Sequence, residues 1–252
     1  MAKAKSSIIY RGASLLDGKP VVVVAIVKSG NKKTGPMLQT YVLNDNGATP
    51  CENSKNGSDF SICGNCPHRG VATDSPKAKQ ALKRSCYVVI SQGATIVHKA
   101  IERGVYPVAT GHAQIAAIGA GRMVRLGTYG DPSAIPSYIW DSLLSDAAGH
   151  TAYTHQNTLA GADFRPDLYM VSADTFQQAA DAWKAGQRTF RVIDSVDARD
   201  TQNEILCPAS AEAGQRTTCD RCGLCAGASI KAKNIAIVAH GAGAANFSAN
   251  VQ

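Results

Sequence analysis

The stretch LYMVSADTFQQAADAWKAGQRTFRVID, residues 168–194, changes its periodicity twice. Leu168–Ala173 and Thr189–Asp194 are short apolar runs of the kind that forms buried strands. Between them, Thr175–Ala185 has the spacing of a helix, for which Asp174 is the predicted N-cap. A strand, a helix and a second strand in this order predict parallel strands that are joined by a right-handed crossover.

The same alternation extends over most of the second half of the chain. Helices are predicted at Ser91–Arg103 and Pro136–Ala148, where apolar residues recur at helical spacing. Further strands are expected at Met123–Thr128, Ala152–His155 and Ile235–His240. About five or six such strands are too few for a closed eight-stranded barrel. The sequence therefore predicts an α/β fold, either a partial (βα) barrel or an open parallel sheet.

The beginning of the chain has a different pattern, which predicts a small β-hairpin unit. Its strands are expected at Ser7–Arg11, Lys19–Lys28 and Gly35–Leu43. Asn44–Arg84 shows no periodicity, and about 40 residues without structure would be unusual in a compact domain. Bound metal is the expected means of ordering them. We predict an N-terminal β-hairpin unit over residues 1–50, a cysteine-containing metal loop over 51–86 and an α/β domain with a second metal site over 87–252.

Composition narrows the class of protein. The chain has 252 residues, of which 44% are hydrophobic and 18% charged, as in an ordinary globular protein. Its longest apolar run, Pro20–Val27, is far shorter than the roughly 20 residues of a transmembrane helix, and the N-terminus lacks the apolar stretch of a signal peptide. We therefore expect no membrane contact and a cytoplasmic location. In that compartment eight cysteines are expected to bind metal or do redox chemistry rather than form disulfides.

Charge is unevenly distributed along the chain. Met1–Gly104 has 15 Lys and Arg against 6 Asp and Glu, a net charge of +9, whereas Val105–Gln252 has a net charge of −2. A concentrated basic surface attracts polyanions, so nucleic acid is the predicted partner of the N-terminal part. A solvated basic face, which keeps small β elements soluble, explains the same charge equally well.

Four cysteines near the end of the chain, which we call the C-terminal cysteine group, have the spacing of a metal site. Cys219, Cys222 and Cys225 form two successive C-x2-C steps, and Cys207 precedes them. Four thiolates suit tetrahedral zinc or a [4Fe-4S] cluster. Zinc sites usually pair two separated C-x2-C knuckles, so this spacing favours the cluster.

Cys63, Cys66 and Cys86 form a second set, the N-terminal cysteine group, and His68 follows two residues after Cys66. With His68 as fourth ligand they would make a closed structural zinc site. The three thiolates alone would hold a [4Fe-4S] cluster with one iron open to S-adenosylmethionine or a substrate. Cys51 is another possible fourth ligand, but its surroundings show no knuckle, and it is interpreted as a free thiol.

Polar residues stand at the ends of most predicted strands, which is where parallel α/β proteins place their sites. Asp131 ends MVRLGTYGD and His155 ends AYTH, and neither begins a predicted helix. We predict these two residues as the acid and base of a pocket. The other polar residues at strand ends are Gln156, Ser172, Asp174, Asp194 and His240.

The motifs ICGNCPHRG, RSCYV, VRLGTYGDPSAIP, GHTAYTHQ and CPASAEAGQRTTCDRCGLC resemble a domain family of tailed bacteriophages and prophages, over about Ser7–Gly241. The resemblance implies a phage-encoded protein that acts in the host cytoplasm. A weaker resemblance, to phage relatives of radical S-adenosylmethionine enzymes, implies a partial barrel in which Cys63, Cys66 and Cys86 hold the cluster. The C-x3-C-x2-C spacing of that superfamily is absent.

Two functions are consistent with these patterns. The first is an iron-sulfur enzyme that acts on nucleic acid or a nucleotide, as in DNA modification, with Asp131 and His155 in its pocket. The alternative is a non-catalytic nucleic-acid-binding protein whose loops are held by zinc. The oligomeric state leaves no trace in the sequence.

Overall fold

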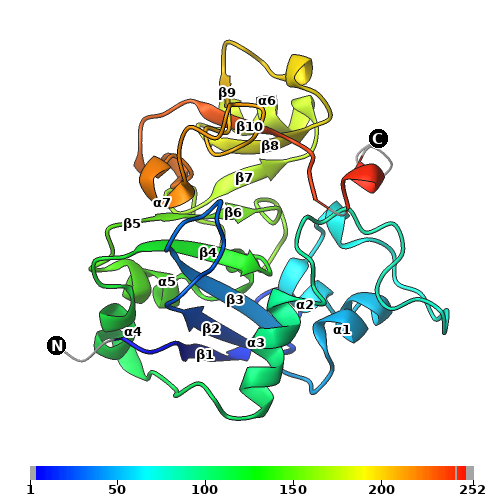
Figure 1. Cartoon of the computed structure of the whole chain (residues 1–252), viewed down its shortest axis with the longest axis vertical. Coiled ribbons are helices and arrows are strands. Elements are labelled where there is room, and N and C mark those ends of the chain that lie inside the picture. The colour runs from blue at the N-terminus through cyan, green and yellow to red at the C-terminus, as the bar shows by residue number, and fades with distance from the viewer. Residues whose placement is uncertain (1–3, 242, 248–252) are drawn as a thin grey trace.

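The computed structural model describes residues 4–241 and 243–247, which contain two five-stranded sheets (Figure 1). In the first sheet, with the order β1-β2-β3-β4-β5, the first three strands are antiparallel neighbours, whereas β4 is parallel to both β3 and β5. Its strands are β1 (Ser7–Ala13), β2 (Pro20–Ile26), β3 (Leu38–Asn44), β4 (Met123–Tyr129) and β5 (Gly149–Thr151).

The second sheet has the order β6-β7-β8-β10-β9, and all of its neighbouring strands are parallel. Its strands are β6 (Tyr153–Thr154), β7 (Met170–Ala173), β8 (Thr189–Ile193), β9 (Glu204–Leu206) and β10 (Asn234–Val238). The predicted α/β class is confirmed.

A single short segment joins the two sheets. Only Ala152 separates β5, which pairs with β4, from β6, which pairs with β7. The strands consequently follow one another from β1 at the bottom of Figure 1 to β9 at the top. The β-hairpin unit is part of this arrangement, because β3 pairs with β4 across the expected domain boundary.

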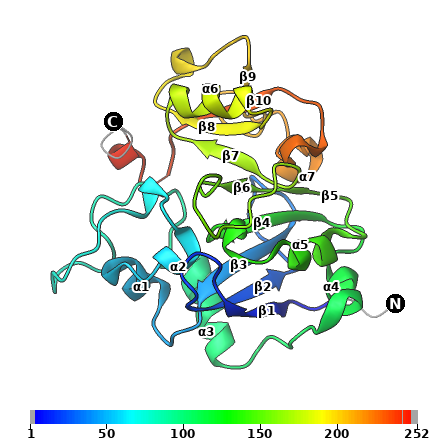
Figure 2. The same ribbon diagram turned by 180° about the vertical axis from the view of Figure 1, so that it is seen from behind.

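Helices α3, α5 and α6 lie where the sequence predicts them, and α6 packs against β7 and β8 (Figure 2). The α-helices are α1 (Pro50–Asn56), α2 (Phe60–Cys63), α3 (Gly93–Glu102), α4 (Gly111–Gly119), α5 (Ser137–Leu144), α6 (Phe176–Lys184) and α7 (Cys219–Cys222). The 3-10 helices are η1 (Pro67–Arg69), η2 (Pro132–Ala134), η3 (Val196–Ala198), η4 (Gly227–Ser229) and η5 (Ala244–Asn246).

The prediction that Asp174 caps α6 is wrong. Thr175 is the N-cap, and its side chain accepts a hydrogen bond from the Gln178 amide at 3.2 Å. The Gln178 side chain in turn accepts from the Thr175 amide, which completes a capping box. The Asp174 side chain is turned to two histidines instead.

The main core lies between the first sheet and its helices. Val21–Ala25 of β2 are at most 1% exposed, and Trp140 of α5 is fully buried, with its indole nitrogen donating to the Pro132 carbonyl at 2.9 Å. A smaller cluster in the second sheet contains Met170, Ile235 and two cysteines of the C-terminal group. In the described part of the chain, every helix is too short or too polar to span a lipid bilayer.

Candidate functional site

A cavity of about 350 Å³ opens at the carboxyl ends of the strands and is lined by residues of both sheets. Five cysteines line it. They are Cys63, Cys66 and Cys86 of the N-terminal group and Cys207 and Cys219 of the C-terminal group. Residues that are far apart in the sequence thus share one chamber.

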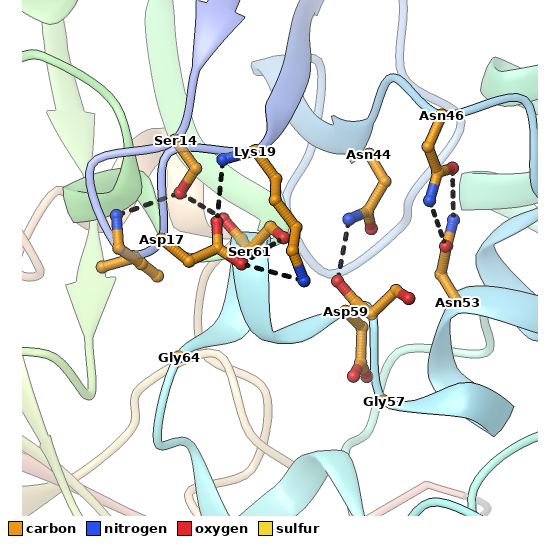
Figure 3. A network of polar contacts seen from close by, with 12 residues as sticks. Ser14, Asp17, Lys19, Asn44, Asn46, Asn53, Gly57, Asp59, Ser61 and Gly64 are labelled. Carbon is orange, nitrogen blue, oxygen red and sulfur yellow. Dashed lines mark hydrogen bonds and ion pairs between the residues drawn. The ribbon is translucent and has the colours of Figure 1, made fainter.

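Helix α2, which ends at Cys63, is fastened to the first sheet by side-chain hydrogen bonds (Figure 3). The Ser14 hydroxyl donates to the Ser61 carbonyl at 2.6 Å, and the Ser61 hydroxyl donates to Asp17 at 2.8 Å. The Asn44 side chain donates to the Ser58 carbonyl at 2.8 Å. These bonds fix the start of the cysteine loop.

Arg69 holds the same loop from the other side. Its guanidinium donates to Asp59 at 3.0 Å and to the carbonyls of Gly64 and Gly57 at 3.1 and 2.7 Å. Burial raises the pKa of Asp59, although the contacts with Arg69 oppose this effect. Arg69, paired with Asp59, therefore holds the backbone on both sides of Cys63.

Gln156, at the end of β6, fixes the turn between Cys63 and Cys66. Its side chain is fully buried, donates to the Cys63 carbonyl at 2.8 Å and accepts from the Asn65 amide at 3.0 Å. Gly64 has a φ of 52°, and a Cβ at this position would lie 2.3 Å from the Gln156 side-chain oxygen. The C-x2-C turn therefore requires this glycine.

Asp174 connects two histidines beside this turn. One of its oxygens lies 2.7 Å from His68 Nε2 and 3.3 Å from His155 Nε2, and His68 Nδ1 lies 2.8 Å from the Ser85 hydroxyl. Burial would raise the pKa of Asp174, but the hydrogen bonds from the histidines outweigh burial and hold it well below its usual range. This carboxylate therefore stays ionised between the rings.

His155 also contacts the N-terminal cysteine group. Burial lowers the pKa of His155, but the Cys66 thiolate and the hydrogen bonds with Asp174 and Cys66 raise it well above its usual value. The His155 amide donates to Asp131 Oδ2 at 2.9 Å, and Asp131 Oδ1 accepts from the Ser133 amide and hydroxyl. Asp131 lines the cavity and positions the backbone of His155.

The C-terminal cysteine group lies in less polar surroundings. Cys207 and Cys225 belong to the apolar cluster of the second sheet, and Cys219 and Cys222 begin and end α7. Burial raises the pKa of Cys225 to about 12, and the other three cysteines add to this effect. Without metal the Cys225 thiol is protonated at neutral pH, so metal binding to it would release a proton.

Backbone contacts hold the C-terminal loop in place. Arg188 donates to the carbonyls of Leu224 and Gly227, both at 2.8 Å. The Cys219 amide donates to the Lys33 carbonyl at 3.0 Å, so the β2–β3 loop lies against α7 (Figure 1). Two loops from opposite ends of the chain thus meet at one side of the cavity.

The distance between the sulfur ligands differs between a zinc site and a [4Fe-4S] site. Zinc–sulfur bonds of about 2.3 Å place tetrahedral ligands about 3.8 Å apart. Among the described residues, only His68, His155 and Asp174 bring three potential ligand atoms within 4.8 Å of one another, and no three cysteines do so. A [4Fe-4S] cluster binds each thiolate to a different iron and spaces them more widely. In either group, tetrahedral zinc would therefore require the described thiols to move closer together.

The other candidate ligands of the N-terminal group have partners elsewhere. His68 directs both ring nitrogens to Asp174 and Ser85, and Cys51 packs against the main core. Asp194 is exposed. Sequence reasoning missed Arg125, which lines the cavity although it lies within a strand. A charged residue inside the run MVRLGT was the available signal.

Neither the family models nor the curated proteins nor the solved structures compared with this chain give a match. The contacts described above therefore carry the functional proposal.

Proposed function

We propose that this protein is an iron-sulfur enzyme in which the N-terminal cysteine group holds a [4Fe-4S] cluster with one iron open to the cavity. The observation that carries the proposal is that Cys63, Cys66 and Cys86 all line the cavity while His68 is bound to Asp174 and Ser85. A cluster with three thiolate ligands leaves one iron able to bind a ligand from solution.

The polar residues of the cavity wall have distinct roles in this proposal. His155 lines the cavity and is the group placed to exchange a proton with a bound ligand. Asp174 orients its ring and Asp131 holds its backbone. Asp131 and Asp174 are therefore positioning residues.

The C-terminal cysteine group would hold a second cluster in this proposal. The other three cysteines of the group raise the pKa of Cys225, and two members of the group line the same cavity as the N-terminal group. Four thiolates would complete the coordination of that cluster and leave no iron open. The second cluster would then support structure or electron transfer rather than bind substrate.

The substrate in this proposal is a nucleic acid or a nucleotide, and the ligand of the open iron is S-adenosylmethionine. The net charge of +9 over Met1–Gly104 supports a polyanionic partner. The resemblance of the cysteine motifs to phage proteins supports the ligand and a role in an infected cell.

The test is the electron paramagnetic resonance spectrum of the reduced, anaerobically purified protein. In a Cys222→Ser variant, which keeps the N-terminal group, S-adenosylmethionine should change the spectrum. The same change should persist in Cys222→Ser/His68→Ala, because His68 is not a ligand in this proposal. Cys222→Ser/Cys51→Ser is the matched control and should also respond.

Three results would contradict the proposal. The first is a protein that contains zinc and no labile sulfide, and the second is loss of metal from the N-terminal group on His68→Ala. A cluster whose spectrum does not respond to S-adenosylmethionine or to cyanide, which binds open iron, would also contradict it.

A further inference from the structure

Arg125 of β4 lines the cavity together with cysteines of both groups, and no acidic partner is found for it among the described residues. Its guanidinium carbon is 5.8 Å from the centre of the Tyr87 ring and 5.7 Å from that of Tyr153, and Nη2 donates to the Tyr87 hydroxyl. Within residues 4–241 and 243–247, no carboxylate lies within 4.0 Å of Arg125. Its Nε is shielded from solvent and makes no hydrogen bond in this part of the chain.

The cavity around Arg125 carries excess positive charge. Lys33 and Arg84 also line it, and Lys33 Nζ lies 3.3 Å from His240 Nε2. Among the described lining residues the only carboxylate is Asp131, which already accepts hydrogen bonds from the Ser133 amide and hydroxyl and the His155 amide. The cations therefore face a space without a matching protein anion.

A guanidinium nitrogen that is shielded from water and unpaired, as Arg125 Nε is, is unfavourable, whereas a bound oxyanion would accept a hydrogen bond from it. The negative charge of a metal-thiolate cluster would balance part of the charge but would not pair this donor. A second polar atom points to the same conclusion. Thr128 of β4 lines the cavity, and its hydroxyl oxygen is shielded from solvent and has no partner within the described residues.

We propose that Arg125 and Thr128 form a subsite that binds the oxyanion of a small substrate, either a phosphate ester or a carboxylate. The rest of the ligand would lie against Phe190, Val192 and Ile237, which give the cavity an apolar wall. The inference rests on the proposed function only in treating this ligand as the substrate.

The volume of the cavity limits the size of the ligand that it can hold. A volume of about 350 Å³ is within the range of small-molecule sites, so the bound anion is a small molecule. A double helix does not enter such a space, so a nucleic-acid substrate would reach it only as a single extruded nucleotide.

The test is isothermal titration calorimetry on the full chain with three probes that share the adenosine group. They are adenosine 5′-monophosphate, the 5′-carboxylate of adenosine, and adenosine. We expect one or both anions to bind about 10- to 100-fold more tightly than adenosine, as charge-assisted hydrogen bonds require. The stronger of the two anions tells a phosphate from a carboxylate substrate.

Arg125→Gln should remove this preference, and Arg125→Lys should retain part of it. Arg103→Gln, at an exposed position after α3, is the matched control and should bind like the unchanged protein. Circular dichroism shows whether each variant is folded. If Arg125→Gln does not fold, Thr128→Val supplies the test and should weaken anion binding about tenfold.

Equal affinity for the three probes, no binding of any of them, or unchanged anion binding in Arg125→Gln would overturn the inference. Iron and sulfide are measured on the same samples. Anion binding that depends on Arg125 in a protein without iron would support the subsite and refute the iron-sulfur proposal. Iron and sulfide in a protein whose anion binding does not depend on Arg125 would support the iron-sulfur proposal and refute the subsite.

Discussion

The two cysteine groups meet at one cavity but are held there by different forces. The N-terminal group lies on a loop that hydrogen bonds fasten on all sides, through Ser61, Arg69 and Gln156. The C-terminal group takes part in an apolar cluster, where Cys207 and Cys225 are 7% and 9% exposed. Hydrogen bonds hold the first loop, whereas in the second group the thiols take the place of core side chains.

Under the proposed function, this difference would give the two metal sites different tasks. A loop that is fixed by polar contacts can leave a coordination position open and still keep its geometry. A site that replaces part of the core gains most when all four thiolates bind metal. We therefore assign reactivity to the N-terminal group and stability to the C-terminal group.

The largest effect is expected from Arg69→Leu. It leaves Asp59, which is 3% exposed, without its ionic partner, and should lower the free energy of unfolding by about 3–5 kcal/mol. The N-terminal group should lose its metal while the C-terminal group keeps it. Urea denaturation and metal analysis check both. Arg165→Leu, which breaks exposed ion pairs, is the control and should cost at most about 1 kcal/mol.

Replacing single thiols in the metal-free protein compares the groups directly. Cys225→Ser places a hydroxyl in the apolar cluster and should lower the free energy of unfolding by about 2–3 kcal/mol. Cys66→Ser, at a half-buried position beside His155, should cost less than about 1 kcal/mol. Equal losses in urea denaturation would show that the two surroundings do not differ as described.

Gln156→Ala tests whether hydrogen bonds hold the first loop. The Cys63 carbonyl and the Asn65 amide would lose their partner, with an expected cost of about 2 kcal/mol. Iron bound by the N-terminal group should fall, and iron bound by the C-terminal group should not. Gln177→Ala on the exposed side of α6 is the control. An unchanged iron content would mean that the turn does not need Gln156.

Thr175→Ala has the smallest expected effect. It removes the cap of α6 and should cost about 1 kcal/mol in thermal or urea unfolding without changing either metal site. Thr110→Ala is a close control, because Thr110 is the N-cap of α4 but its side chain makes no capping hydrogen bond. If the two substitutions cost the same, the capping box does not stabilise α6.

The sequence was sufficient for the strands and helices with strong periodicity. The strand through Val21–Ala25 was predicted because the run is short, continuous and apolar, and the crossover through α6 because the helix has a helical period between two such runs. Helix α4, GHAQIAAIG, was missed because its apolar residues surround the helix and show no preferred face. The T-x-x-Q pattern at Thr175 was present but was overlooked in favour of Asp174.

The candidate site was predictable only in part, for a physical reason. C-x2-C spacing is local, so it marks Cys63 and Cys66 in the sequence itself. The contact of Asp174 with His68 joins residues 106 positions apart, and only the packing of the two sheets brings them together. Arg125 has no neighbouring acidic residue whose spacing would have marked it.

The most direct test of the central claim is the amount of iron, zinc and labile sulfide in the anaerobically purified chain and in Cys63→Ser and Cys225→Ser. Two clusters predict about eight iron and about eight sulfide per chain, falling to about four of each in either variant. Zinc without sulfide, or the same iron content in all three proteins, would contradict the assignment of the two cysteine groups.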